Sequence, residues 1–214
     1  MCGRFVMLTR EEVARVVAAV ERGEWLQPLD DTIERAQAFP GSEIEAFGTP
    51  DGSLAIGSFH WGFPVEWGKN PVFNTRIESA LAGRGMWRDM VESGRCIVPA
   101  VSFFEPHRSE TVRSPKTGRQ IKRAYEFTQD DNSPLLLAAL TDGTHCSIVT
   151  TEPNRWVSPI HDRMPLALRF EEVERWLEGS VSEIEPLADR SAFNLNAHPE
   201  FENPAAEPPQ LSLF

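Results

Sequence analysis

The feature that most constrains the fold is a succession of short apolar segments through the middle of the chain. They are rich in β-branched, aromatic or leucine side chains and are bounded by turn-forming residues, as β-strands are. They lie at residues 54–61, 96–99, 101–105, 124–128, 135–140 and 147–151. Proline is expected to separate the second segment from the third. Because helical patterns occur only at intervals, the fold class is predicted to be α+β rather than a regular βαβ alternation.

Three segments carry helical patterns. Residues 10–22 follow the capping-box pattern Thr9-Arg10-Glu11-Glu12, and their valines recur at helical spacing. A second helix is predicted over about 78–92, where Gly94 is well placed to end it. A short acidic helix is predicted at 171–178, followed by Gly179.

Composition excludes several classes of protein. The 214 residues suit one domain with a tail. No apolar run approaches the ~20 residues of a membrane span, and the N-terminus lacks the apolar core of a signal peptide. We therefore expect a cytoplasmic protein that has no membrane partner. Three cysteines with no CxxC pair disfavour a disulfide framework and a structural zinc site, and no metal or cofactor is predicted.

The net charge of -11 argues, at face value, against a nucleic-acid binder. The charge is unevenly distributed, however: residues 60–169 carry 14 basic and 12 acidic side chains, whereas the flanks carry 7 and 20. One stretch is clearly basic and includes Arg108, Arg113, Lys116, Arg119, Lys122 and Arg123. Taken alone it is typical of a solvated hairpin loop. The acidic total does not exclude DNA, and the acidic flanks are expected to limit non-specific duplex binding.

Cysteine at position 2 is the most informative single residue. Methionine aminopeptidases remove Met1 when the next side chain is small, which would leave a 1,2-aminothiol with an amine pKa of about 7.7–8.0. Such an amine condenses with an aldehyde to a Schiff base, and the thiol then closes a thiazolidine ring. The same group could act as an N-terminal nucleophile in amide cleavage. In an arbitrary sequence, a second-position cysteine more often has neither role.

Five ordered sequence blocks decide between these interpretations. They are Cys2-Gly3-Arg4-Phe5, Trp61-Gly62 with Trp67, Phe73-Asn74-Thr75-Arg76-Ile77-Glu78-Ser79, Arg95-Cys96-Ile97-Val98-Pro99-Ala100 with Phe103-Phe104-Glu105, and Ile160-His161-Asp162-Arg163-Met164-Pro165. In this order and spacing the chain resembles the SRAP (SOS-response-associated peptidase) family, the abasic-site processing proteins. The resemblance spans residues 2 to about 178, and the blocks are specific as a set.

The resemblance implies a fold and an activity. The fold would consist of curved antiparallel β-sheets forming a barrel-like core, with peripheral helices and a groove for single-stranded DNA. The catalytic domain would span residues 1–195 and act as a monomer in the cytoplasm, associated with the nucleoid. It would shield abasic sites in single-stranded DNA by a covalent thiazolidine crosslink. Self-processing peptidase activity, crosslink reversal and lyase-type chemistry are further activities that the resemblance implies.

Four residues carry the implied chemistry. Cys2 would supply the amine and the thiol, and Asn74 would position the sugar and the N-terminus by hydrogen bonds. Glu105 would be the acid/base that opens the sugar, which suits a carboxyl group in a partly apolar pocket. His161 would assist Schiff-base formation and reversal, since its side chain titrates near neutral pH. Taken singly, Glu105 is typical of a surface carboxylate and His161 of a structural histidine.

Five further residues would contact DNA. Arg4, Arg76 and Arg163 would hold phosphates, because the planar guanidinium binds two oxygens at once. Trp67 would stack on a base, which contributes about 1–3 kcal/mol without sequence preference. Thr150 is expected to make a hydrogen bond in the site.

The chain departs from the family pattern on both sides of the Phe103-Phe104-Glu105 block. Ser102 replaces the usual glycine, and Pro106 replaces the usual tryptophan. Proline lacks a backbone donor and stiffens the strand end, which puts the placement of Glu105 in question. Both departures leave the four reacting groups in place. Cys96 and Cys146 are predicted to be buried core thiols.

The C-terminal residues 196–214 are predicted to be a flexible tail, since they are rich in proline and poor in large apolar side chains. The tail ends in Gln210, Leu211, Ser212, Leu213 and Phe214. These residues resemble the peptide by which bacterial repair proteins dock on the β sliding clamp. The alternative is that the tail packs on its own domain.

Two other functions remain open at this point. One is an N-terminal-nucleophile cysteine peptidase or amidohydrolase that uses Cys2, Glu105 and His161, with the bond after Met1 as its expected substrate. The other is a non-catalytic single-strand binding module tethered to the clamp.

Overall fold

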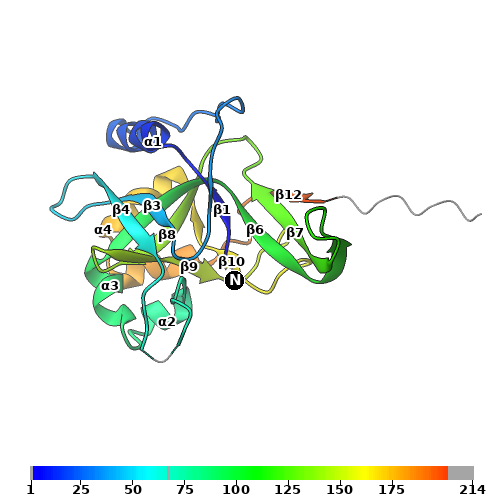
Figure 1. The fold of residues 1–214 in the computed structure, drawn as a ribbon. Coiled ribbons are helices and arrows are strands. Elements are labelled where there is room, and N and C mark those ends of the chain that lie inside the picture. The colour runs from blue at the N-terminus through cyan, green and yellow to red at the C-terminus, as the bar shows by residue number, and fades with distance from the viewer. Residues whose placement is uncertain (1, 67, 202–214) are drawn as a thin grey trace, which may run out of the picture.

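The computed structural model describes residues 2–66 and 68–201, and its strands belong to one extensively paired sheet (Figure 1). Most neighbouring strands are antiparallel, as expected, but β4 and β5 each run parallel to β9. The strands are β1 Phe5–Met7, β2 Gln37–Ala38, β3 Glu43–Gly48, β4 Ala55–Trp61, β5 Asn74–Arg76, β6 Arg95–Arg113, β7 Gln120–Thr128, β8 Leu135–Thr141, β9 His145–Thr151, β10 Met164–Pro165, β11 Ala167–Leu168 and β12 Asn196–Pro199.

Five of these strands close into a barrel. They follow the order β8, β9, β4, β3, β6, and the ring closes because β6 also pairs with β8. The barrel-like core and the α+β class are therefore confirmed. Parallel strands need a long connection between them. The chain between β4 or β5 and β9 is long enough to allow this parallel pairing.

The continuous apolar run of β8 is explained by burial on both faces of the strand. Leu135 and Leu137 point into the barrel, where they join its interior cluster. Leu136 and Ala138 belong to a second cluster, between the outside of the barrel and the helices. Burying a leucine contributes about 1.5–3 kcal/mol, so the run stabilises the barrel and the helical layer together.

The helices cover the outside of the barrel. They are α1 Arg10–Arg22, α2 Ile77–Leu81, α3 Trp87–Ser93, α4 Val173–Glu178 and α5 Val181–Ile184, with 3-10 turns η1 Phe170–Glu172 and η2 Glu185–Ala188. The structure confirms α1 and its capping box: Thr9 accepts from the backbone of Glu12, whose side chain accepts from the backbone of Thr9. The acidic helix predicted at 171–178 appears as η1 followed by α4.

The single helix predicted over 78–92 is wrong, because the segment forms α2 and α3 with a break between them. Gly83 and Gly85 in the break both have φ of 57°, in the left-handed region. Residues with this backbone conformation cannot continue a right-handed helix. Gly94 ends α3 as predicted, and its N–H donates to the carbonyl oxygen of Met90 at 2.8 Å.

Strand β6 runs without a break through two prolines, contrary to the expected interruption. Pro99 lies between the residues of β6 that pair with β3 and those that pair with β1. Pro106 lies where the register with β7 shifts before Thr111. Pro99 is paired regularly with Leu136 of β8 but lies where β6 changes partner on its other edge, and Pro106 lies at the irregularity; fewer ladder hydrogen bonds are needed at both positions. The backbone N–H groups of Ser109 and Glu110 donate instead to Nδ1 of His107.

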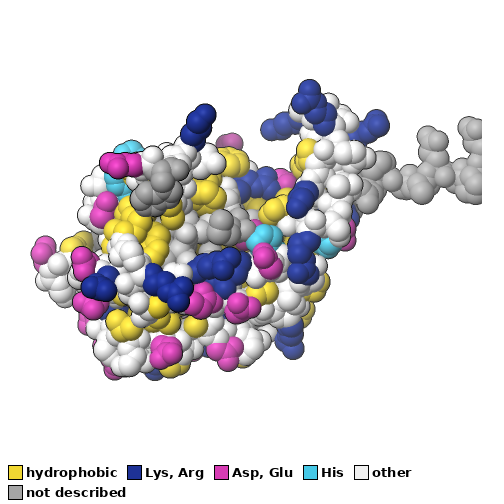
Figure 2. Space-filling model, turned by 90° about the horizontal axis from the view of Figure 1, so that it is seen from below, with side chains coloured by type: hydrophobic (Ala, Val, Ile, Leu, Met, Phe, Trp, Pro, Cys, Tyr) yellow, Lys and Arg dark blue, Asp and Glu magenta, His cyan; other side chains and the backbone are white. Residues whose placement is uncertain are grey.

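Beyond this irregularity, β6 and β7 continue as a hairpin arm, residues 107–124, that extends from the barrel (Figure 1). The predicted basic loop is largely this paired arm, since Thr111–Arg113 of β6 lie opposite Gln120–Lys122 of β7. Arg113, Lys116, Arg119 and Lys122 are exposed on it. Figure 2 shows Lys and Arg side chains gathered on the arm and on the neighbouring face of the barrel.

The predicted boundary at residue 196 does not coincide with the end of the sheet. Asn196–Pro199 form β12, which pairs antiparallel with Thr128–Tyr125 of β7. Backbone pairing with an exposed strand edge therefore orders residues that composition alone assigned to a flexible tail. The predicted clamp-binding residues Gln210, Leu211, Leu213 and Phe214 lie outside the described residues.

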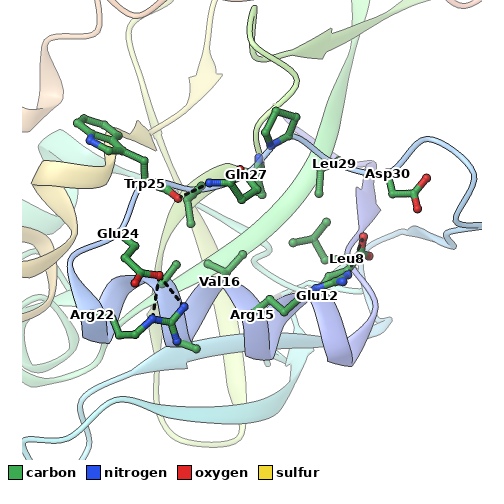
Figure 3. Close-up of a pocket in the computed structure, with 15 residues that line it drawn as sticks. Leu8, Glu12, Arg15, Val16, Arg22, Glu24, Trp25, Gln27, Leu29 and Asp30 are labelled. Carbon is green, nitrogen blue, oxygen red and sulfur yellow. Dashed lines mark hydrogen bonds and ion pairs between the residues drawn. The ribbon is translucent and has the colours of Figure 1, made fainter.

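The described residues contain a cavity but no membrane-spanning helix. In the described ranges, no helix is long and apolar enough to span a membrane. A cavity of about 450 Å³ lies between α1 and the segment after it (Figure 3), where Val16 and Leu29 are among the apolar lining residues. None of the residues that line it belongs to the predicted active site.

The close packing of Gly94 generates a stability prediction. A Cβ at this position would overlap the carbonyl oxygen of Thr141 on β8. We expect Gly94→Ala to lower the free energy of unfolding by roughly 1–3 kcal/mol, because the strand must shift to admit the methyl group. Urea denaturation followed by circular dichroism measures the change. The exposed α3 substitution Glu92→Ala should stay within about 0.5 kcal/mol of wild type, and equal effects of the two would contradict the prediction.

Candidate active site

Cys2 is buried inside one end of the barrel. The antiparallel pairing of β1 with β6 places Phe5 opposite Phe103, and the Phe104 N–H donates to the Arg4 carbonyl oxygen at 2.9 Å. Cys2 is 0% exposed, and its Sγ lies 3.6 Å from the same carbonyl oxygen. Burial, together with the negative charge of Glu105, raises the pKa of the Cys2 thiol well above its usual value. The thiol is therefore neutral at physiological pH.

Asn74 fixes the backbone at Cys2 from the opposite side. Its Nδ2 donates to the Cys2 carbonyl oxygen at 2.7 Å. Asn74 begins β5, which pairs in parallel with β9 from Ile148 to Thr150. The hydroxyl of Thr150 donates to the Thr75 carbonyl oxygen at 3.3 Å, so Thr150 helps to hold the strand that carries Asn74. Thr150, predicted to make a hydrogen bond in the DNA site, is buried, and its hydroxyl donates to the protein backbone.

Glu105 is a carboxyl group buried in β6. It is 0% exposed and lies opposite Tyr125 of β7. Burial raises the pKa of Glu105 from 4.5 to about 8, and the negative charge of Asp162 also raises it. Phe103, two residues before Glu105 on the same face of β6, belongs to the buried interior cluster and supplies apolar surroundings of the predicted kind. At neutral pH most of this carboxyl group is protonated, so it can donate a proton.

His161 faces the same carboxyl group. Its Nε2 lies 3.7 Å from Oε2 of Glu105, while the Arg163 backbone nitrogen lies 3.1 Å from Nδ1. Nδ1 also lies 3.0 Å from the Arg163 carbonyl oxygen, so in the neutral ring it either accepts from the Arg163 N–H or donates to that carbonyl, and Nε2 faces Glu105 in both tautomers. Burial lowers the pKa of His161, which favours this neutral form.

The irregular part of β6 fixes the segment that carries His161. The Arg108 N–H donates to the Ile160 carbonyl oxygen at 3.0 Å, and Nη2 of Arg108 donates to the Ser158 carbonyl oxygen at 2.6 Å. The His161 N–H donates to the Val157 carbonyl oxygen at 2.8 Å. The strand that carries Glu105 therefore also holds the loop that carries His161.

The structure thus brings the four predicted reacting residues into one site. Asn74 contacts Cys2, Glu105 acts electrostatically on Cys2, and His161 lies beside Glu105. A nucleophile, an amide donor and a neutral acid next to a neutral imidazole suit condensation with a carbonyl compound. In the part of the chain that is described, no three His, Cys, Asp or Glu side chains are arranged to hold a metal ion.

The residues predicted to bind DNA differ in their surroundings. Arg76 is exposed at the end of β5. Arg163 is buried and forms a two-bond ion pair with Glu78 at 2.9 and 3.0 Å, so its side chain braces β10 against α2. Arg4 is paired with Glu200. Trp67 lies outside the described residues.

The two departures from the family pattern fit without displacing the site. The Ser102 hydroxyl is buried and donates to Oε1 of Glu126 at 2.6 Å. Pro106 is exposed and follows Glu105 at the irregularity of β6, while Glu105 itself stays paired with β7. Cys96 and Cys146 are buried thiols, as predicted, and burial raises the pKa of Cys96 to about 12.

Comparison with known proteins decides the family. The model for SOS response associated peptidase (SRAP) matches residues 1–199. The chain belongs to the SRAP family. Among solved structures, a phage-related protein from Bordetella bronchiseptica has a TM-score of 0.66 at 21% identity and covers 92% of this chain and 93% of its own. A protein from Bacteroides thetaiotaomicron has a TM-score of 0.63 at 22% identity, with coverages of 92% and 91%. These two share the SRAP fold described above.

Curated SRAP relatives carry a functional name. Abasic site processing protein YedK of Escherichia coli (strain K12) is 28% identical over 193 residues, which cover 85% of this chain and 82% of YedK. Abasic site processing protein YoqW of Bacillus subtilis (strain 168) is 27% identical over 187 residues, which cover 83% of this chain and 80% of YoqW.

The sequence of this SRAP protein does not reveal the acidic partners of Arg163 and Arg4. Glu78 lies inside one of the five blocks, yet its role as the partner of Arg163 has no signature in a single sequence. In the sequence, Glu200 is one of many acidic residues in the C-terminal flank. Both act through contacts between distant segments, which spacing along the chain does not reveal.

The raised pKa of Glu105 predicts a specific dependence of stability on pH. Because the folded protein favours the protonated carboxyl, this contribution to stability is complete below about pH 4.5 and is lost as the pH rises through 8. Glu105→Gln is neutral at every pH. The unfolding free energy of Glu105→Gln relative to wild type should therefore increase between pH 5 and pH 8.5, by on the order of 3 kcal/mol.

Urea denaturation at several pH values measures this difference. Glu171→Gln removes an exposed carboxyl and serves as the control for loss of a negative charge. A Glu105→Gln difference that is flat from pH 5 to pH 8.5 would show that Glu105 ionises normally in the folded protein.

Proposed function

We propose that this SRAP protein captures abasic sites in single-stranded DNA as a thiazolidine on Cys2, after removal of Met1. The observation that carries the proposal is the buried Glu105 carboxyl, with its pKa raised to about 8, beside Cys2 and His161. The names of the curated relatives support abasic-site processing as the process served.

The first step is the opening of the sugar. An abasic sugar is mostly a ring-closed hemiacetal, and protonated Glu105 donates to the ring oxygen as the C1 hydroxyl loses its proton to a base. The free amine of Cys2 then adds to the C1 aldehyde to form a carbinolamine. Loss of water, with Glu105 or His161 as the acid, leaves a Schiff base. Asn74 keeps the Cys2 backbone in place through its 2.7 Å hydrogen bond.

The second step closes the ring. The Cys2 sulfur adds to the Schiff-base carbon, and the thiol proton ends on the nitrogen, so aldehyde and aminothiol become thiazolidine and one water. Because burial keeps the Cys2 thiol neutral, the thiol must give its proton to a base as the C–S bond forms. The neutral His161 pair with Glu105 accepts and returns protons, which also serves reversal. Lyase-type chemistry would start from the same Schiff base.

DNA reaches this site across a face that is more basic than the whole molecule. The hairpin arm carries exposed Arg113, Lys116, Arg119 and Lys122, and Arg76 lies exposed beside Asn74. Figure 2 shows Lys and Arg side chains on the arm and on the neighbouring face of the barrel. Phosphate contacts from the arm, from Arg76 and from Arg4 would hold the strand, while Trp67 would stack on a base next to the lesion.

Peptide-bond cleavage is the second candidate, and the family description itself names a peptidase. A cysteine peptidase needs a thiolate, yet the pKa of Cys2 is raised, and the close partner of His161 is Glu105. These observations favour carbonyl condensation over peptide hydrolysis. Removal of Met1, by a methionine aminopeptidase or by self-processing, is the one peptide-bond cleavage that the proposed capture requires.

We also propose that residues 210–214 dock on the β sliding clamp. Leu213 and Phe214 would fill an apolar pocket on the clamp, and Gln210 would add hydrogen bonds. Tethering would raise the local concentration of the protein at replication forks, where abasic sites meet single strands.

The crosslink itself provides the main test. Protein lacking Met1, incubated with a single-stranded abasic oligonucleotide, should give a heat-stable shifted band on a denaturing gel. Cys2→Ala should abolish the thiazolidine, and Glu105→Gln should slow its formation by about 100-fold because the general acid is lost.

An undamaged oligonucleotide of the same sequence is the matched control. Protein that retains Met1 should give no crosslink, because its Cys2 nitrogen lies in an amide. A stable crosslink from that protein would contradict the thiazolidine mechanism. Peptide turnover without crosslinking would support the peptidase, and reversible binding unaffected by Cys2→Ala would support a binding module.

A pull-down tests the clamp proposal separately. Immobilised full-length protein should retain purified β sliding clamp, and deletion of residues 210–214 should abolish retention because the apolar anchors are lost. Substituting Ser212→Ala, between the proposed anchors, should leave retention unchanged. Equal retention by the deleted chain would contradict the proposal.

A further inference from the structure

The guanidinium of Arg4 is already occupied by an anion from the other end of the chain. Nη1 and Nη2 donate to Oε1 and Oε2 of Glu200 at 2.6 and 2.7 Å, although the residues are 196 positions apart. The Arg4 guanidinium also lies 3.9 Å above the ring of Phe104. The Phe104 ring thus covers one face of the guanidinium, and the Glu200 carboxylate accepts hydrogen bonds from its Nη1 and Nη2.

Glu200 is delivered to this position by strand pairing. It directly follows β12, and its N–H donates to the Ala124 carbonyl oxygen at 2.9 Å. Nε of Arg123 donates to the Phe201 carbonyl oxygen at 2.9 Å on its other side. These contacts to the backbone hold the Glu200 carboxylate against Arg4, so the ion pair is built into the fold rather than formed by two freely moving surface side chains.

The bound carboxylate has the chemistry of a phosphate ligand. A guanidinium makes the same two parallel N–H···O bonds to a carboxylate as to a phosphate, and the two anions compete for one edge. Arg4 follows Cys2 by two residues, and its carbonyl oxygen contacts the Cys2 sulfur. A phosphate that binds the Nη1/Nη2 edge of Arg4 must therefore displace Glu200.

We infer that Glu200 is a specificity-determining residue that occupies the Arg4 anion position in the free protein and so weakens binding of undamaged single strands. The inference rests on the proposed function, because it assigns Arg4 to DNA phosphate. Competition by Glu200 reduces the affinity for every strand alike. A strand with an abasic site is retained nevertheless, since its covalent bond to Cys2 does not depend on Arg4. The protein thus stays on abasic strands rather than on undamaged ones, because reversible binding is weak and only the covalent bond retains a strand.

The binding of a fluorescein-labelled, undamaged single-stranded oligonucleotide, followed by anisotropy over a range of salt concentrations, tests this inference. Glu200→Gln should bind about 3–10-fold more tightly at low salt, and log affinity should fall more steeply with log salt, by about 0.7 for one added phosphate contact. Asp130→Asn, at an exposed position after β7, makes the same change of charge and should alter affinity less than twofold.

Two further variants separate competition from general electrostatics. Glu200→Asp keeps the charge but shortens the side chain by one methylene, so it should weaken the hold on Arg4 and raise DNA affinity part of the way. In an Arg4→Gln background, Glu200→Gln should bring no gain, because the contested guanidinium is absent. Urea denaturation verifies that each variant is folded, and Glu200→Asp serves if Glu200→Gln does not fold.

The outcomes are distinct. Two results would overturn the inference: equal gains in DNA affinity for Glu200→Gln and Asp130→Asn, or a gain for Glu200→Gln that persists in the Arg4→Gln background. Glu200 would then only hold β12 in place. The denaturing-gel assay on the same proteins reports on the proposed function separately. A Cys2-dependent crosslink with unchanged anisotropy refutes only the inference. An Arg4-dependent gain in affinity without any crosslink refutes only the proposed capture chemistry.

Discussion

The antiparallel pairing of β1 with β6 is the interaction on which the site depends. It seats the first residues of the chain against the strand that carries Glu105, with Phe5 opposite Phe103 and the Phe104 N–H bonded to Arg4. A chain terminus is ordinarily poorly ordered. Here strand pairing and burial hold Cys2 close to the Glu105 carboxyl group, whose pKa burial raises to about 8.

Strand β6 links this site to the rest of the molecule. Its first residues close the barrel against β8, its middle carries Glu105, and its outer part forms the hairpin arm. The irregularity after Pro106 turns Arg108 toward the segment that carries His161. Barrel stability, the placement of acid and imidazole, and the basic surface therefore all depend on one strand of 19 residues.

Sequence patterns predict the local elements well and the long-range contacts poorly. The capping box at Thr9 and the apolar run of β8 identify their elements because the signal lies within each segment. The prolines of β6 mislead, since their tolerance depends on which neighbouring strand is paired at each position. The grouping of Cys2, Asn74, Glu105 and His161 follows from family resemblance, whereas the pair of Arg4 with Glu200 has no local signal.

The most direct test of the central claim is the intact mass of the crosslink with an abasic oligonucleotide, measured before and after borohydride treatment. A thiazolidine on the N-terminal Cys2 predicts the mass of the Met1-free protein plus the oligonucleotide minus one water, unchanged by borohydride. A crosslink that retains Met1, keeps the water, or gains two hydrogens on reduction would contradict the account, because each requires a different bond to the sugar.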